Sequence, residues 1–145
     1  MNEKTILIAI GTNAHRSKNM KKARMLLDGH IKDIRFTKSM NTEAIGIHAK
    51  DFLNCLASGT TTDSFEEVND WLKDIERQCG NTEEKRHDGL IEMDLDILEY
   101  AGDRYHEKDW QRDYIVKLYK ELNNEENGNA RRSIHADDGS ECSAI

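Results

Sequence analysis

The amino-acid sequence predicts one α+β domain in which strands and helices follow the order βαββαβ, with a further helix at the end. Three observations indicate this class. Short apolar runs rich in β-branched residues are expected strands, and longer segments with apolar residues at helical spacing lie between them. The length of 145 residues suits one domain better than two.

The N-terminal half supplies three strands and a helix. A nearly continuous apolar run predicts a buried strand over residues 4–10, and Gly11-Thr12-Asn13 ends it in a tight turn. Apolar residues at helical spacing predict a helix from Ser17 to about His30. Two more strands are expected over 31–40 and 51–60, joined by a loop.

The second helix is the most strongly indicated element. Ser64 and Glu67 form a capping box at the start of an apolar stripe, and Gly80 ends the helix. The polar segment 81–89 has no periodicity, so we expect an exposed, mobile loop there.

The remaining elements complete the pattern. Residues 91–100 alternate as a half-buried strand, with Glu92, Asp94 and Asp96 on its polar side. Helical spacing returns over 106–122, and 123–145 is expected to be a disordered tail. Residues 1–122 thus predict a ferredoxin-like sandwich, an antiparallel sheet with helices on one face and an additional C-terminal helix.

Composition excludes several functions. The chain has 21 basic and 28 acidic side chains, a net charge of -7, so we expect no nucleic-acid partner. Its longest apolar run, residues 6–10, is too short for a membrane span or a secretory signal, which favours a soluble, cytoplasmic protein without a membrane partner. We also expect a monomer. Cys55, Cys79 and Cys142 lack Cys-x-x-Cys spacing, which favours reduced thiols over a zinc site.

Two carboxylates form the sharpest candidate site. Asp94 and Asp96 are two apart on a strand, so they share one face with Cα atoms roughly 6 to 7 Å apart. A magnesium ion bound to nucleotide phosphates would relieve their repulsion. The alternative is a polar strand face that meets water. His106 and Arg112, around the start of a helix, could face an anion or simply lie on the surface.

Several motifs occur in the order and spacing of one family. They are Ile8-Ala9-Ile10-Gly11-Thr12-Asn13, Phe52-Leu53-Asn54, Ile75-Glu76 with Gly80, Asp94-Leu95-Asp96-Ile97, and His106 with Arg112 and Tyr114. Over about residues 5–122 the sequence resembles the 6-hydroxymethyl-7,8-dihydropterin pyrophosphokinase family of the folate pathway. The resemblance implies a ferredoxin-like transferase that moves the terminal diphosphate of ATP to the pterin's hydroxymethyl group and releases AMP.

The resemblance also implies roles for individual residues. Asp94 and Asp96 would hold two Mg²⁺ ions, and His106 and Arg112 would act in catalysis at the ATP phosphates. Glu76 would lie near the nucleotide. The implied pterin pocket comprises Gly11, Thr42, Ile45, Phe52, Asn54 and Tyr114. From the residues alone, the aromatic side chains could equally be core and Asn54 a strand-edge hydrogen-bonding group.

The sequence departs from the family at several site positions. Two usual arginines are replaced by Asn81 and Ile91, and a usual aromatic loop residue is Asp88. The usual prolines are also missing, since the chain contains none. Lys85 and Arg86, in the same segment, could supply cations to ATP instead. Two alternatives follow: a weakened or inactive paralogue that binds nucleotide or pterin, and a ferredoxin-like regulatory module.

Overall fold

The computed structural model describes residues 2–43 and 50–129 and confirms the α+β class. A six-stranded sheet has the order β2-β4-β1-β5-β6, with β3 paired to β4, and every pairing is antiparallel. The strands are β1 (Lys4–Thr12), β2 (Lys32–Phe36), β3 (Met40–Thr42), β4 (Phe52–Thr61), β5 (Asp94–Tyr100) and β6 (Asp103–Arg104). The central position of β1 is what its continuous apolar sequence predicts.

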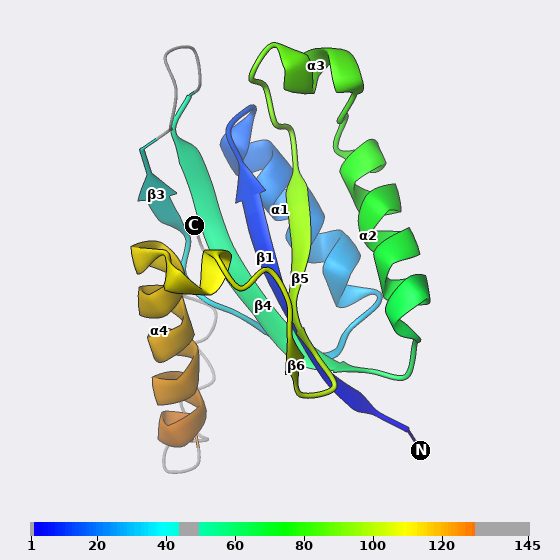
Figure 1. Cartoon of the computed structure of the whole chain (residues 1–145), viewed down its shortest axis with the longest axis vertical. Helices are drawn as coiled ribbons and strands as arrows, with labels where there is room; N and C mark the ends of the chain where they lie inside the picture. The colour runs from blue at the N-terminus through cyan, green and yellow to red at the C-terminus, as the bar shows by residue number, and fades with distance from the viewer. Residues whose placement is uncertain (1, 44–49, 130–145) are drawn as a thin grey trace.

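Helices cover both faces of this sheet, not one as predicted (Figure 1). They are α1 (Arg16–Asp28), α2 (Phe65–Gln78), α3 (Glu83–His87), the 3-10 turn η1 (Asp109–Gln111) and α4 (Asp113–Asn129). The larger core lies between one face and helices α1 and α2. A second core on the other face joins η1 and α4 to Leu7, Leu56 and Leu98. The one-face prediction was wrong because β1, β4 and β5 carry apolar side chains in both directions.

Element boundaries differ from the predictions in three places. Segment 81–89 is not an irregular loop, because it contains the helix α3. Strand β5 begins at Asp94 and not at Ile91. The helix predicted over 106–122 is split into η1 and α4, and α4 continues past Leu122 to Asn129. The rest of the predicted tail, 130–145, lies outside the described residues.

The strongest local signal, the capping box, is present at the start of α2. Ser64 Oγ accepts a hydrogen bond from Glu67 N at 3.1 Å, and Glu67 Oε1 accepts one from Ser64 N at 2.8 Å. These bonds satisfy two backbone donors that a helix N-terminus otherwise leaves unpaired. Helix α2 then packs its buried residues on β5 beside the aspartate pair.

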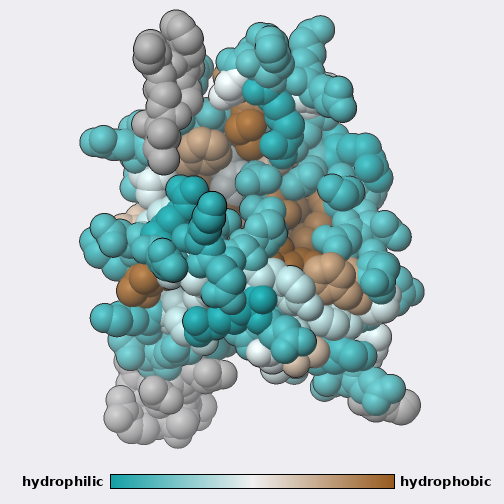
Figure 2. All heavy atoms as spheres, in the orientation of Figure 1, coloured by the Kyte–Doolittle hydropathy of each residue, from teal (hydrophilic) through white to brown (hydrophobic). Residues whose placement is uncertain are grey.

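The surface reflects the polar composition. In the view of Figure 2 most of the face is hydrophilic, and apolar side chains show mainly in hollows between charged ones. None of the helices in the described ranges is long and apolar enough to cross a membrane.

Candidate active site

The sheet register brings three predicted site residues into one row. Gly11, near the end of the central strand β1, pairs with Asn54 of β4 on one side and with Asp94 of β5 on the other. Ala9, two residues earlier, pairs with Asp96. Because paired residues in adjacent strands lie close together, residues distant in sequence meet at this end of the sheet.

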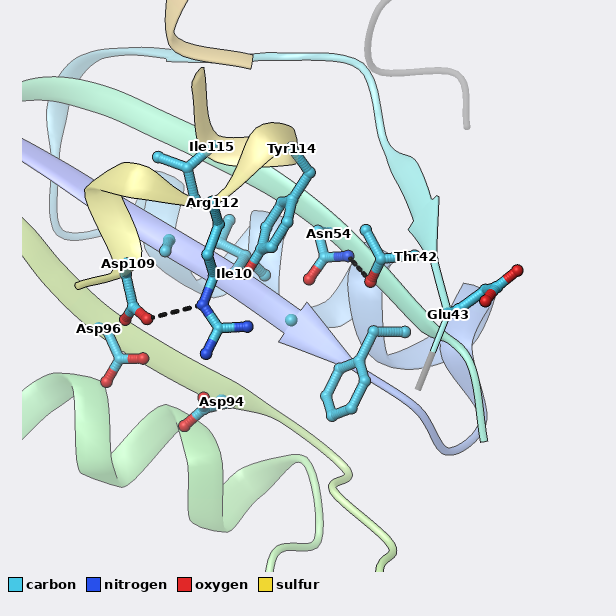
Figure 3. A pocket seen from close by; sticks show the side chains of 13 residues that line it. Ile10, Thr42, Glu43, Asn54, Asp94, Asp96, Asp109, Arg112, Tyr114 and Ile115 are labelled. Carbon is cyan, nitrogen blue, oxygen red and sulfur yellow. Dashed lines mark hydrogen bonds and ion pairs between the residues drawn. The ribbon is translucent and has the colours of Figure 1, made fainter. Parts of the chain in front are cut away.

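A pocket of about 290 Å³ opens over this row (Figure 3). Its lining includes most of the predicted pterin and metal residues, together with Arg112, which was predicted to bind ATP: Gly11, Thr42, Phe52, Asn54, Asp94, Asp96, Arg112 and Tyr114. Ala9, Ile10, Glu43, Asp109 and Ile115 complete it. The predicted residue Ile45 falls outside the described residues. About half of the lining residues are polar or charged, and the others give the pocket apolar and aromatic surface on which a flat ligand could lie.

Asn54 presents a fixed hydrogen-bonding group to this pocket. Its side chain is buried, and Nδ2 donates to Thr42 Oγ1 at 2.8 Å and to the carbonyl oxygen of Met40 at 3.2 Å. With the amide nitrogen engaged, Oδ1 is left on the side of Gly11 and can accept a hydrogen bond from a ligand. A Cβ atom at Gly11 would lie 3.2 Å from this oxygen, so glycine keeps the floor of the pocket open.

A second pocket, of about 500 Å³, lies on the other side of the aspartate pair. Glu76, Arg86 and His106 line it, which brings together three of the residues predicted to bind ATP. Asp94 and Asp96 line both pockets. The two aspartates therefore stand where ligands in the two pockets would meet.

The aspartate pair is electrostatically strained. Burial, together with the neighbouring charge of Asp94, raises the pKa of Asp96 to about 6. His106, whose Nε2 lies 3.9 Å from Asp96 Oδ1, offsets part of this rise, and on the other carboxylate Arg86 Nη2 lies 3.4 Å from Asp94 Oδ1. A divalent cation between the carboxylates would relieve the repulsion more completely, so the residues present fit Mg²⁺.

Additional ligands would be needed to complete a magnesium site. Within the described ranges, no group of three or more histidine, cysteine, aspartate or glutamate side chains could hold a metal ion. Mg²⁺ favours octahedral coordination by oxygen and usually keeps waters and substrate phosphates among its ligands. Two carboxylates facing two pockets are consistent with a metal that arrives with a nucleotide.

Glu76 has a structural contact besides its place in the second pocket. Its Oε2 accepts a hydrogen bond from the backbone N–H of Leu95 at 2.8 Å. Burial raises the pKa of this carboxyl, and the hydrogen bond from Leu95 offsets part of the rise. Glu76 therefore links α2 to the strand segment between the two aspartates.

Asp109 is a site residue that the sequence analysis missed. Its Oδ1 accepts a hydrogen bond from Arg112 Nε at 3.0 Å, and its Oδ2 lies 4.0 Å from His106 Nδ1. Figure 3 shows the rest of the Arg112 guanidinium directed toward the two aspartates. The three-residue spacing of Asp109 and Arg112 in the sequence was the one indication that the two side chains could pair.

Lys85 lines neither of these two pockets. Its Nζ donates to Glu92 Oε2 and to the carbonyl oxygen of Gly80, both at 3.0 Å. The Glu92 side chain is only 5 % exposed, so its predicted place on a water-facing strand side was wrong. Burial would raise the pKa of Glu92, but hydrogen bonds from His15, Lys85 and Asn19 outweigh it and lower the pKa to about 2.

The two positions where the family usually has arginine carry structural contacts here. Asn81 Oδ1 accepts from Met93 N at 3.0 Å, and its Nδ2 donates to the carbonyl oxygen of Met93. Ile91 N donates to Asn13 Oδ1 at 2.6 Å, and Asn13 N donates to the carbonyl oxygen of Ile91 at 3.0 Å. Neither position supplies a cation to the pockets.

Comparisons with known proteins identify the family of this chain. Residues 7–124 match the family model described as 7,8-dihydro-6-hydroxymethylpterin-pyrophosphokinase. The chain is also 32% identical over 124 residues to the "Folate synthesis bifunctional protein" of Arabidopsis thaliana. The alignment covers 77% of this chain and 25% of that relative, so the chain spans about a quarter of its length. Because the family match covers most of the chain, this protein belongs to the 7,8-dihydro-6-hydroxymethylpterin-pyrophosphokinase family.

Proposed function

We propose that the protein transfers diphosphate from ATP to the hydroxymethyl group of 6-hydroxymethyl-7,8-dihydropterin, releasing AMP, as a step of folate biosynthesis. The observation that carries this proposal is that two pockets meet at the Asp94–Asp96 pair. A transfer between two bound substrates needs that arrangement, because the reacting atoms must be held about 3 Å apart. The family match supplies the identities of the substrates.

The first pocket suits the pterin. Phe52 and Tyr114 offer aromatic surface for a flat ring, and Asn54 offers a buried acceptor for a ring N–H or amino group. Because Asp94 and Asp96 also line this pocket, a pterin bound there could have its hydroxymethyl group beside the proposed metal ligands.

The second pocket suits the triphosphate of ATP. Arg86 and His106 line it, and Arg112 approaches the aspartates from the first pocket. Mg²⁺ on the aspartates would neutralise phosphate charge, which matters in a chain of net charge -7. In the reaction the pterin hydroxyl loses its proton, and its oxygen forms a bond to the β-phosphorus. The bond from that phosphorus to the oxygen shared with the α-phosphate breaks, and AMP leaves with that oxygen.

The direct test is AMP production from ATP, Mg²⁺ and the hydroxymethyl-dihydropterin. We expect Asp94→Asn and Asp96→Asn each to reduce AMP formation by at least about a hundredfold, because each removes a charged metal ligand. Asp103→Asn is the matched control, since this exposed aspartate lies on β6 away from both pockets. Wild-type protein that binds both substrates and yields no AMP above background would refute the proposed transfer.

A weakened or inactive paralogue is the second candidate. The observation that favours it is that neither usual arginine position carries a cation: the Asn81 side chain bonds the backbone of Met93, and the Ile91 side chain is apolar. Losing one preorganised donor typically costs about 3 to 4 kcal/mol of transition-state stabilisation. This candidate predicts Mg-ATP and pterin binding with little AMP. Calorimetric titration alongside the AMP assay separates it from the first.

A further inference from the structure

The helix α3 has an unusual dependence on polar contacts. It has only five residues, and none of them is buried. A helix this short is not stable in isolation, and apolar packing cannot hold one that buries nothing. What fixes α3 against the rest of the protein must therefore be hydrogen bonds and ion pairs.

The ion pair between Lys85 and Glu92 links α3 to a buried carboxylate, whereas Arg86 of the same helix pairs with the more exposed Asp94. Besides Lys85, Glu92 accepts hydrogen bonds from Asn19 at 2.7 Å and from His15 at 3.0 Å, both on the α1 side of the sheet. Lys85 lies at the middle of α3, and its side chain spans from there to Glu92 and Gly80. Removing Lys85 or the Glu92 charge would loosen α3 while leaving the backbone bonds of Asn13 in place.

Arg86, the residue after Lys85, is the residue that α3 presents to the second pocket. Arg86 lines that pocket, and its Nη2 is 3.4 Å from Asp94 Oδ1. Lys85 and Arg86 therefore have separate roles, one directed to the core and one to the site. The Arg86 side chain is 41 % exposed and extends to Asp94 from a helix with no buried residue, so the position of its guanidinium depends on the position of α3.

We propose that Glu92 is a positioning residue: through Lys85 it holds α3 in the place from which Arg86 binds the phosphates of ATP. This inference deepens the proposed function and rests on ATP as the ligand of the second pocket. Of the two cations that the sequence analysis offered for ATP, the inference assigns phosphate binding to Arg86 and gives Lys85 a supporting role. It also explains how phosphate binding could persist in a chain that has Asn81 and Ile91 in place of arginines.

The test is a double-mutant cycle on Mg-ATP affinity, measured by titration with a fluorescent ATP analogue and no pterin. We expect Arg86→Ala to weaken binding about tenfold and Glu92→Gln to weaken it about fivefold. In the Arg86→Ala background, Glu92→Gln should have no further effect, because the group that it positions is already gone. Glu84→Gln is the matched control, an exposed carboxylate on the same helix, and should change affinity less than twofold.

The outcomes separate a positioning role from a structural one. Additive losses in the double variant, or unchanged affinity in Glu92→Gln, would overturn the inference. If Glu92→Gln does not fold, Lys85→Gln is decisive, because it removes the cation and leaves the bonds of Glu92 to Asn19 and His15 intact. Rescue by Lys85→Arg supports the inference, since arginine keeps the charge.

Failure of the proposed function would look different. If wild-type protein binds Mg-ATP and makes no AMP, while the effects of Glu92→Gln and Arg86→Ala on affinity are not additive, the transfer is refuted and the inference stands. Normal AMP formation with affinity that is insensitive to both variants would refute the inference alone. Wild-type protein that does not bind Mg-ATP would refute both.

Discussion

Replacing Glu92 by glutamine should destabilise the folded protein in a pH-dependent way. The native environment lowers the pKa of Glu92 to about 2 from an ordinary value of 4.5, although burial acts in the opposite direction. A shift of about 2.5 pH units corresponds to about 3 kcal/mol of stability, at about 1.4 kcal/mol per unit. This agrees in size with the cost of removing one partner from a buried ion pair.

The pH dependence follows from the direction of the shift. Because the folded-state pKa is lowered, the stabilising contribution is fully present above about pH 4.5 and is lost as the pH falls toward 2. The stability difference between wild-type protein and Glu92→Gln should therefore be largest at neutral pH and shrink steadily below pH 4.5.

Urea unfolding monitored by Trp71 and Trp110 fluorescence measures both effects. Wild-type protein, Glu92→Gln and Glu84→Gln are compared at pH 7 and at several values between 5 and 3. The exposed control should differ from wild type by less than about 0.5 kcal/mol. A loss below about 1 kcal/mol at pH 7, or a loss that stays constant in acid, would show that the contacts of Glu92 do not stabilise the fold as described.

Three further changes test other parts of the molecule. Gly11→Ala should weaken pterin binding at least tenfold and leave Mg-ATP affinity unchanged, because its Cβ would lie 3.2 Å from Asn54 Oδ1; calorimetry with each ligand measures this. Asp109→Asn should raise KM for ATP severalfold, since it weakens the hold on Arg112, and steady-state AMP assays would show an unchanged KM if Arg112 needs no such support. Leu118→Ala should cost about 2 to 5 kcal/mol in thermal or urea unfolding, and a smaller loss would mean that α4 contributes little to the second core.

The sequence predicted most of the site because its residues lie on strands with clear signals. Asn54, Gly11 and Asp94 belong to strands recognisable from their apolar runs, and the antiparallel arrangement places them in one row. The motif order along the chain then identified the family that the comparisons confirm.

The features that were missed depend on tertiary contacts. Alternation placed Glu92 on the water-facing side, but it precedes β5 and turns inward to Lys85, His15 and Asn19. Two of these three contacts come from residues more than 70 positions away in the chain. Likewise, alternation places Leu98 on the same side as Asp94 and Asp96, but it is fully buried in a second core that exists only because α4 folds onto that face. Local periodicity predicts neither the burial of Glu92 nor that of Leu98.

The row formed by Asn54, Gly11 and Asp94 has a consequence for how this family can diverge. Adjacent strands in a sheet are about 4.8 Å apart, so the backbones of Asn54 and Asp94 are held about 10 Å apart by two sets of ladder hydrogen bonds. The separation of Asn54 and Asp94 across the first pocket is therefore a property of the sheet and independent of the surrounding loops. Substitutions such as Asn81 and Ile91 can alter the charge at the periphery of the site while the separation of Asn54 and Asp94 stays fixed by the sheet.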